Sequence, residues 1–398
     1  MEALLFGLIG LHLPKAFTLL YAALALLAWR TRKAPPLAPQ LRWCLGALVL
    51  FSISYSAISV YYGLWQLGGR DLLDLVSMVL LPAGCVWIGA RAAAVLSWRQ
   101  RSWLWLAYGL GALAYVWIVL LHGRVFSPVG GWFELWSGRR DTGIAAPWGP
   151  DPLVNVRSVE QNAALACAWL LPGLWLLRRF VQAKILCLAG GLGLLATLCF
   201  GGRLGLLVVA LGGLPVAIGW MRSRRRHQAL VLAVLTGMTA LALAVMSSPK
   251  LGLRLYDERF DRFRGFLRNF GQFPWGGNVM HFVAYDSVRS AQLWFDARQG
   301  ELMHNVFLDL YVRVGLLPLL LLLLALVPLL LRALACLALV LRQETLQLDG
   351  CIAGGFLVCL SVQWLFQPLL YGDGLLFYVG FLLIGTLAGE PSWRGDEP

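Results

Sequence analysis

Long apolar runs divide the chain, and they constrain its fold more than any other feature of the sequence. They fall at about residues 3–29, 43–62, 72–96, 102–122, 162–177, 182–200, 204–221, 228–246, 314–336, 351–370 and 374–388. A helix needs roughly 20 apolar residues to cross a bilayer, and most of these runs approach or exceed that length. The first run has His12, Pro14 and Lys15 at its middle, so it forms either one kinked helix or two short ones. We therefore predict an all-α integral membrane protein, a single polytopic domain over residues 1–398 with 11 or 12 transmembrane helices.

The composition supports this prediction. Of the 398 residues, 59% are hydrophobic and only 13% are charged, whereas a soluble domain has about a quarter of its residues charged. Most of the surface is therefore expected to face lipid. The eight cysteines lie in or beside apolar runs, and their spacing fits neither a disulfide framework nor a zinc site.

The net charge of +13 comes from basic residues that stand between the apolar runs, which does not favour a nucleic-acid partner. The basic clusters fall at residues 30–42, 98–101, 178–179, 222–226 and 332–342. Such clusters mark the cytoplasmic side of a membrane protein. Alternation of the runs then places 123–161 and 247–303 outside, as a first and a second periplasmic loop, and the C-terminus in the cytoplasm.

The second loop contains the pattern of an amphipathic helix at residues 253–270. Its apolar residues recur every three or four positions, as a helix lying in the membrane interface requires; they are Tyr256, Phe260, Phe263, Leu267 and Phe270. The other face of this helix carries Arg259, Arg262, Arg264 and Arg268. These arginines either hold anionic lipid headgroups or belong to a binding site.

The strongest local pattern follows this loop, at His304-Asn305. A helix that begins near His304 and continues into the next apolar run places two sets of residues on separate faces. The first set is His304, Leu308, Tyr311 and Gly315; the second is Asn305, Asp309 and Arg313. Asp309 and Arg313 are expected to pair, because an isolated charge at a membrane edge is costly. His304 is either a proton acceptor in a reaction or a capping or interfacial histidine.

Arg203 follows Gly201 and Gly202 in a turn between two runs and precedes a new helix. Free backbone N–H groups and a guanidinium together favour a phosphate site. The alternative is an arginine that reaches the headgroup level from a membrane helix. Arg140 and Asn162, in and after the first loop, are weaker candidates.

Several common catalytic devices are not found in the external loops. These loops contain no P-loop, dinucleotide fingerprint, HExxH or GxSxG motif, and no Asp-x-Asp pair to hold a metal. We therefore expect no metal and no cofactor. An arginine-lined external site with one candidate base suits an anionic, lipid-linked substrate, and it suits an anion transporter almost as well.

These residues resemble the motifs of the O-antigen ligase and O-antigen polymerase superfamily of bacterial inner membranes. Arg203 and Leu207 match the family's Arg-x3-Leu element at an external turn. His304-Asn305, nine residues and Gly315 match its histidine element, with Pro318 where the family has glycine, threonine or a similar residue.

The segment between the two elements adds to the likeness, which covers roughly residues 130–320. Phe273–Asn278 is similar to the family's Pro-x-Gly-like segment, and Arg259 or Arg262 stands at a suitable distance before it. Arg140–Gly143 and Asn162 are similar to its Arg…Gly…Asn element.

The resemblance implies a glycosyltransferase of the GT-C type in the bacterial inner membrane, with its active site facing the periplasm. Its donor would be a glycan on undecaprenyl diphosphate, used without metal or nucleotide. His304 would orient or deprotonate the acceptor hydroxyl, which attacks the anomeric carbon with inversion. Four arginines would neutralise the diphosphate, namely Arg203, Arg259, Arg262 and Arg264, and the supporting residues would be Asn305, Arg140, Asn162, Asp309 and Arg313.

Three functions remain open at this stage. A ligase would transfer the glycan to lipid A-core oligosaccharide, and a polymerase would transfer it to a second lipid-linked repeat unit. The complete histidine motif favours the ligase. A transporter or flippase of anionic lipid-linked sugars is the third, although the sequence lacks the repeated halves typical of transporters.

Overall fold

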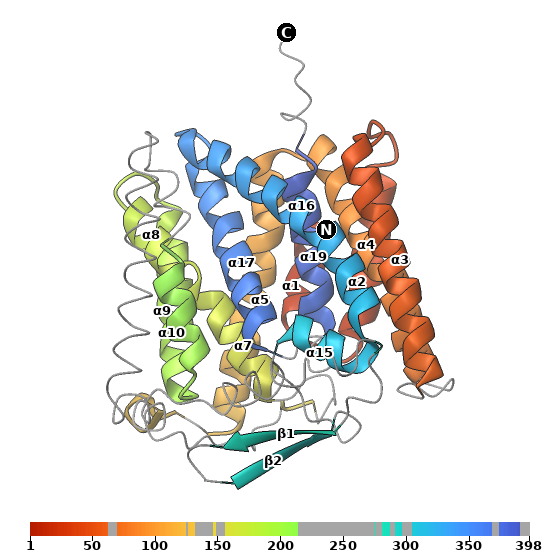
Figure 1. The fold of residues 1–398 in the computed structure, drawn as a ribbon. Helices are drawn as coiled ribbons and strands as arrows, with labels where there is room; N and C mark the ends of the chain where they lie inside the picture. The colour runs from red at the N-terminus through yellow and green to blue at the C-terminus, as the bar shows by residue number, and fades with distance from the viewer. Residues whose placement is uncertain are drawn as a thin grey trace, which may run out of the picture.

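The computed structural model describes residues 1–62, 70–124, 126–131, 146–148, 156–213, 275, 281–286, 291–296, 305–367 and 374–390. For residues 70–74, 156–161, 203, 281–286, 291–296 and 374 it describes the backbone. The described part is a bundle of helices with a small β-hairpin at one end (Figure 1).

The helices coincide closely with the apolar runs of the sequence. They are α1 Glu2–Gly10, α2 Ala16–Arg30, α3 Pro39–Tyr61, α4 Arg70–Val95, α5 Trp98–His122, α7 Val156–Cys167, α8 Leu170–Leu176, α9 Ala183–Cys199, α10 Arg203–Leu211, α15 Val306–Val314, α16 Leu316–Arg342, α17 Gln347–Phe366 and α19 Gly374–Ala388. Among the described residues, five helical stretches are long and apolar enough to cross a membrane, within α3, α4, α5, α16 and α17. The chain is therefore a largely helical, multi-pass membrane protein.

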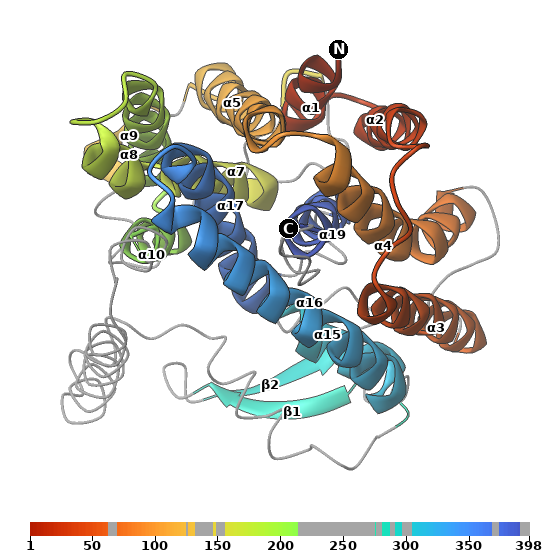
Figure 2. The same cartoon turned by 90° about the horizontal axis from the view of Figure 1, so that it is seen from above.

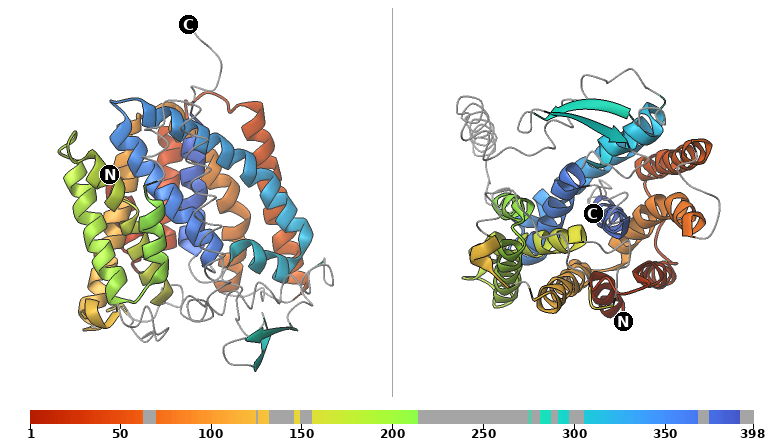
Figure 3. Two further views of the ribbon diagram at one scale, coloured as in Figure 1. Left: turned by 60° about the vertical axis from the view of Figure 1, so that its left-hand side comes forward. Right: turned by 90° about the horizontal axis from the view of Figure 1, so that it is seen from below.

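Helix α19 forms the centre of the bundle. Figures 2 and 3 show it inside a ring that includes α1, α4, α5, α16 and α17. Every residue from 375 to 388 is buried, as expected for a helix that is apolar on all sides. Its closest approach is to α4, where a methyl group at Gly89 would come within 2.5 Å of the Leu382 carbonyl oxygen. Small residues at such a crossing let two membrane helices pack backbone against backbone.

The first apolar run forms two helices rather than one kinked helix. Helix α1 ends at Gly10 and α2 begins at Ala16, and both His12 (φ 47°) and Lys15 (φ 70°) adopt left-handed backbone conformations between them. Two left-handed residues interrupt the right-handed helix. The run at 162–177 is also divided, since α7 ends at Cys167 and α8 begins at Leu170. Pro172 accounts for this break, because its ring would clash with the carbonyl group of Ala168, four residues earlier.

The β-hairpin was not predicted from the sequence. Strand β1 (His281–Asp286) pairs antiparallel with β2 (Ala291–Asp296), with His281 opposite Asp296 and Asp286 opposite Ala291. Both strands lie within the stretch that we assigned to the second external loop. The all-α prediction therefore holds for the bundle and is wrong for this loop.

Hydrogen bonds and ion pairs gather the described basic turns at one end of the bundle. The contacts are Arg91 with the Thr31 carbonyl, Arg332 with Gln40, Arg101 with Glu390 and Arg179 with Glu344, at 2.6 to 2.9 Å. The first joins α4 to the turn after α2, and the second joins α16 to the start of α3. The third joins the start of α5 to the residues just after α19, and the fourth joins the turn between α8 and α9 to the turn between α16 and α17. We call this the basic end; it is the upper end in Figure 1, where α19 ends.

The opposite end carries the described parts of several segments that the sequence analysis singled out. We call it the motif end and define it by residues 126–131, 199–203, 281–286, 291–296 and 305–306. The hairpin, α15 and the start of α7 lie there in Figure 1. Among the described residues, Arg203 and Asn305 are thus separated from the basic turns by the length of the bundle.

Candidate functional site

Asn305 fixes the start of α15 at the motif end. Its side-chain Oδ1 accepts hydrogen bonds from the backbone N–H groups of Phe307 and Leu308, both at 3.0 Å. Its Nδ2 donates to the carbonyl oxygen of Leu365, near the end of α17, at 3.0 Å. The first two bonds are those of a helix N-cap, and the third ties that cap to a second helix. The oxygen and the nitrogen of the Asn305 side-chain amide therefore both fix the position of this residue, which follows His304 in the chain.

We expected one helix to run from near His304 into the next apolar run, but α15 and α16 are separate helices. Helix α15 begins at Val306, close to the expected start, and ends at Val314, where Gly315 has φ 85° and ψ −169°. This conformation suits glycine and strains other residues, which explains why the histidine motif has glycine at this position. Gly315 therefore shares no helical face with Tyr311. Pro318 is the third residue of α16, in the first turn, where a helix does not need the missing N–H group.

The expected polar stripe of α15 runs from its cap along the helix. Asp309 lies one turn after Asn305 and is only 2% exposed, and Arg313, one turn further, is half-buried. The backbone N–H of Asp309 donates to the Asn305 carbonyl at 2.8 Å. A carboxylate at this depth needs a partner, because burying an uncompensated charge is costly. That Arg313 is this partner stays a prediction.

Arg203 is the first residue of α10, in a tight turn that follows α9. Gly201 has φ 63°, and the N–H of Gly202 donates to the Thr197 carbonyl at 2.9 Å. The next helix therefore starts at once, with a glycine in the N-cap position. The first N–H groups of a helix have no partner within it and carry partial positive charge. The predicted turn is confirmed; the side chain of Arg203 is outside the described part.

Asn162 is completely buried in α7, with 0% of its surface exposed. Within the described part of the chain, neither its Oδ1 nor its Nδ2 makes a hydrogen bond. A buried amide without a partner costs free energy, so such groups call for an explanation. Ala163, the next residue, belongs to the same buried cluster as Tyr115 and Cys199.

An aromatic group beside this cluster was missed by the sequence analysis. His12 stacks on Tyr115 with ring centroids 5.1 Å apart, and Tyr115 lies 6.0 Å from Trp148 of the first loop. His12 is 2% exposed, and its Nε2 has no hydrogen-bond partner among the described residues. The sequence signal was a histidine inside an apolar run, which we used only to divide that run.

Helix α17 is the scaffold that brings the candidate helices together. It packs against α7, α10 and α15, which carry Asn162, Arg203 and the Asn305 stripe. Near its motif end it buries two further amides, Gln363 (0% exposed) and Gln367 (1% exposed). The sequence analysis missed both, although two glutamines four residues apart in an apolar run were a usable signal.

The other predicted site residues lie outside the described residues. They are His304, Arg140, Arg259, Arg262 and Arg264, together with the expected amphipathic helix at 253–270. Within the described ranges, no three His, Cys, Asp or Glu side chains lie together as metal ligands do.

Comparison with known proteins adds no relative. No protein-family model matches the chain, and no curated protein matches it significantly.

Proposed function

We propose that the chain is a multi-pass glycosyltransferase of the O-antigen ligase type in the bacterial inner membrane. It transfers a glycan from undecaprenyl diphosphate to lipid A-core oligosaccharide. The motif end faces the periplasm and the basic end faces the cytoplasm, as clusters of basic residues favour. The chain crosses the membrane 11 or 12 times, with an interfacial helix in its second periplasmic loop.

The observation that carries this proposal is the arrangement of three helices around α17. The start of α10, the buried Asn162 of α7 and the Asn305 cap of α15 come from sequence positions far apart. Each was selected from a separate motif of the same family. If these three residues matched the family motifs by chance, their helices would not need to contact the same helix. The motif end also lies opposite the described basic turns, which agrees with a periplasmic site.

The histidine and the arginines have separate roles in the proposed reaction. An oxygen of the acceptor sugar attacks the anomeric carbon, the bond from that carbon to the diphosphate oxygen breaks, and the configuration inverts. His304 accepts the proton of the attacking hydroxyl. The leaving undecaprenyl diphosphate takes the bonding electrons, and Arg203 with Arg259, Arg262 and Arg264 neutralises its charge. Asn305 holds His304 in place, and Asp309, Arg313, Arg140 and Asn162 support the site.

The fate of the glycan in cells that lack this gene tests the proposal. Without a ligase, lipid-linked polymer accumulates and no polymer reaches the lipid A-core, and a plasmid copy restores the transfer. A single repeat unit on the core would instead identify a polymerase. Unchanged glycan on the core, without accumulated donor, would contradict both glycosyltransferase functions. Loss of lipid-linked sugar from the periplasmic leaflet would identify a flippase.

Removal of divalent metal is expected to leave transfer by the purified chain unchanged. The two external loops contain no Asp-x-Asp pair, and Mg²⁺ or Mn²⁺ prefers such carboxylate oxygens. Transfer should be measured with and without EDTA, beside a metal-dependent glycosyltransferase that confirms chelation. A loss of transfer that magnesium or manganese restores would contradict this expectation.

A further inference from the structure

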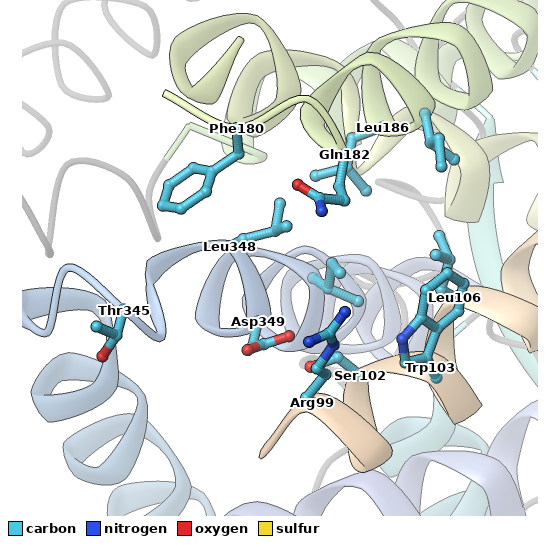
Figure 4. A pocket seen from close by; sticks show the side chains of 12 residues that line it. Arg99, Ser102, Trp103, Leu106, Phe180, Gln182, Leu186, Thr345, Leu348 and Asp349 are labelled. Carbon is cyan, nitrogen blue, oxygen red and sulfur yellow. The ribbon is translucent and has the colours of Figure 1, made fainter. Parts of the chain in front are cut away.

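The basic end contains a crevice that the proposed reaction does not use. It lies between the starts of α5, α9 and α17, has a volume of about 200 Å³, and is shown in Figure 4. Its polar lining residues are Arg99, Ser102, Gln182, Thr345 and Asp349, and its apolar lining residues include Trp103, Leu106, Ile185, Leu186 and Ile352. This is smaller than the roughly 300–1,000 Å³ of a pocket for a drug-sized ligand, so it fits a small polar group and a short apolar segment.

The two charged residues of the crevice have opposite signs. Asp349 lies in the first turn of α17, close enough to the guanidinium groups of Arg99 and Arg101 to interact with them electrostatically. Arg101 is already bound to Glu390 at 2.7 Å. Among the described residues, neither Arg99 nor Asp349 belongs to a close ion pair. Figure 4 shows both side chains on one side of the crevice, with Gln182 across from them.

The apolar part of the crevice includes side chains that are exposed on the outside of the bundle. Trp103 is 47% exposed and Ile185 is 39% exposed, and both follow the polar turns of the basic end by one helical turn or less. Tryptophan is enriched at this depth, where the headgroups meet the hydrocarbon. The crevice thus changes from charged to apolar in the direction in which a phospholipid does.

We propose that this crevice binds the headgroup of phosphatidylethanolamine, with the lipid phosphate on Arg99 and the ammonium on Asp349. A guanidinium forms two parallel hydrogen bonds to a phosphate. The ammonium has three N–H donors for the Asp349 carboxylate and the oxygens of Gln182 and Thr345. The first part of an acyl chain then lies along Leu106, Leu186 and Ile352.

Other phospholipids fit this pair of charges less well. Phosphatidylcholine carries a cation without N–H donors, so Asp349 would lose its hydrogen bonds. Phosphatidylglycerol is anionic and brings no cation to the carboxylate. A chain with a net charge of +13 attracts anionic lipids in general. A preference for zwitterionic phosphatidylethanolamine would therefore distinguish binding at this crevice from nonspecific binding of anionic lipids.

Lipid retention by the purified full-length chain tests this site, and it does not depend on glycan transfer. The delipidated chain is mixed with phosphatidylethanolamine, phosphatidylcholine or phosphatidylglycerol of identical acyl chains, and bound lipids are counted by native mass spectrometry. We expect about tenfold tighter retention of phosphatidylethanolamine than of phosphatidylcholine, as for a charged hydrogen-bonded contact. Equal retention of the three lipids, or preferred retention of phosphatidylglycerol, would overturn the proposal.

Matched variants assign the lipid to this crevice. Asp349→Asn and Arg99→Gln each remove one charge of the crevice. Ile185→Trp keeps both charges but fills the apolar part of the crevice. Each variant should abolish the preference for phosphatidylethanolamine over phosphatidylcholine. Glu2→Gln and Arg42→Gln change the same charges elsewhere at the basic end and should keep it. Arg99 and Ile185 are exposed, so their replacement should not prevent folding. Arg99→Gln and Ile185→Trp therefore test the proposed lipid site even if Asp349→Asn does not fold. An unchanged preference in both would overturn the proposal.

Discussion

Replacement of His304 by alanine is expected to lower glycan transfer by about 10²- to 10⁴-fold, the usual contribution of a general base. The affinity for the lipid-linked donor should remain close to that of the wild-type chain, because the histidine acts on the acceptor hydroxyl rather than on the diphosphate. Asn305 supports this role, since its amide joins the start of α15 to α17 beside position 304. Transfer and donor binding must be measured separately on the same preparations.

His122→Ala is the matched control for this substitution. His122 lies in the last turn of α5 at the motif end and is exposed, so its replacement should change neither transfer nor donor binding. Wild-type transfer by His304→Ala would exclude the proposed base. An equal decrease in donor affinity would instead assign His304 to donor binding and leave the proton to another group.

Within the described part of the chain, the sequence predicted the helices well where an apolar run contains no residue that breaks a helix. The run at 374–388 coincides with α19, and α9 differs by one residue at each end from the run at 182–200. Hydrophobic length is a strong signal in such runs, because a bilayer leaves the backbone no alternative to helical hydrogen bonds. The runs that contain Pro14 or Pro172 are divided, and the sequence left the first of these cases open.

The candidate site was predictable where a backbone conformation demands a particular residue. Asn305 is an N-cap, and Gly315 and Gly201 have positive φ angles, so local chemistry explains these parts of the motifs. The hairpin at 281–296 was missed because its strands stand in a loop where the predicted helix at 253–270 dominated the sequence pattern. His12, Gln363 and Gln367 stand out as polar residues within apolar runs, but which helices bury them depends on packing between elements distant in the sequence.

Arg203 is the second position at which a large effect is expected. Arg203→Ala should weaken binding of the lipid-linked donor by about 10- to 100-fold, the range for a hydrogen bond to a charged group, and should lower transfer as well. Arg203→Lys should restore only part of the affinity, because lysine keeps the charge but not the planar pair of donors. Donor binding should be measured at more than one salt concentration, since salt screens exposed charges.

Arg124→Ala separates a specific diphosphate contact from the general positive field of the motif end. Arg124 is exposed just after α5 and carries the same charge, but it does not begin a helix. Arg203 stands at the N-terminus of α10, whose first N–H groups would face an anion bound there. A specific site therefore predicts a large loss of affinity for Arg203→Ala that persists at high salt, and a small, salt-sensitive loss for Arg124→Ala. Equal losses in the two variants would mean that the donor responds to net charge alone, and Arg203 would then be an arginine at the headgroup level.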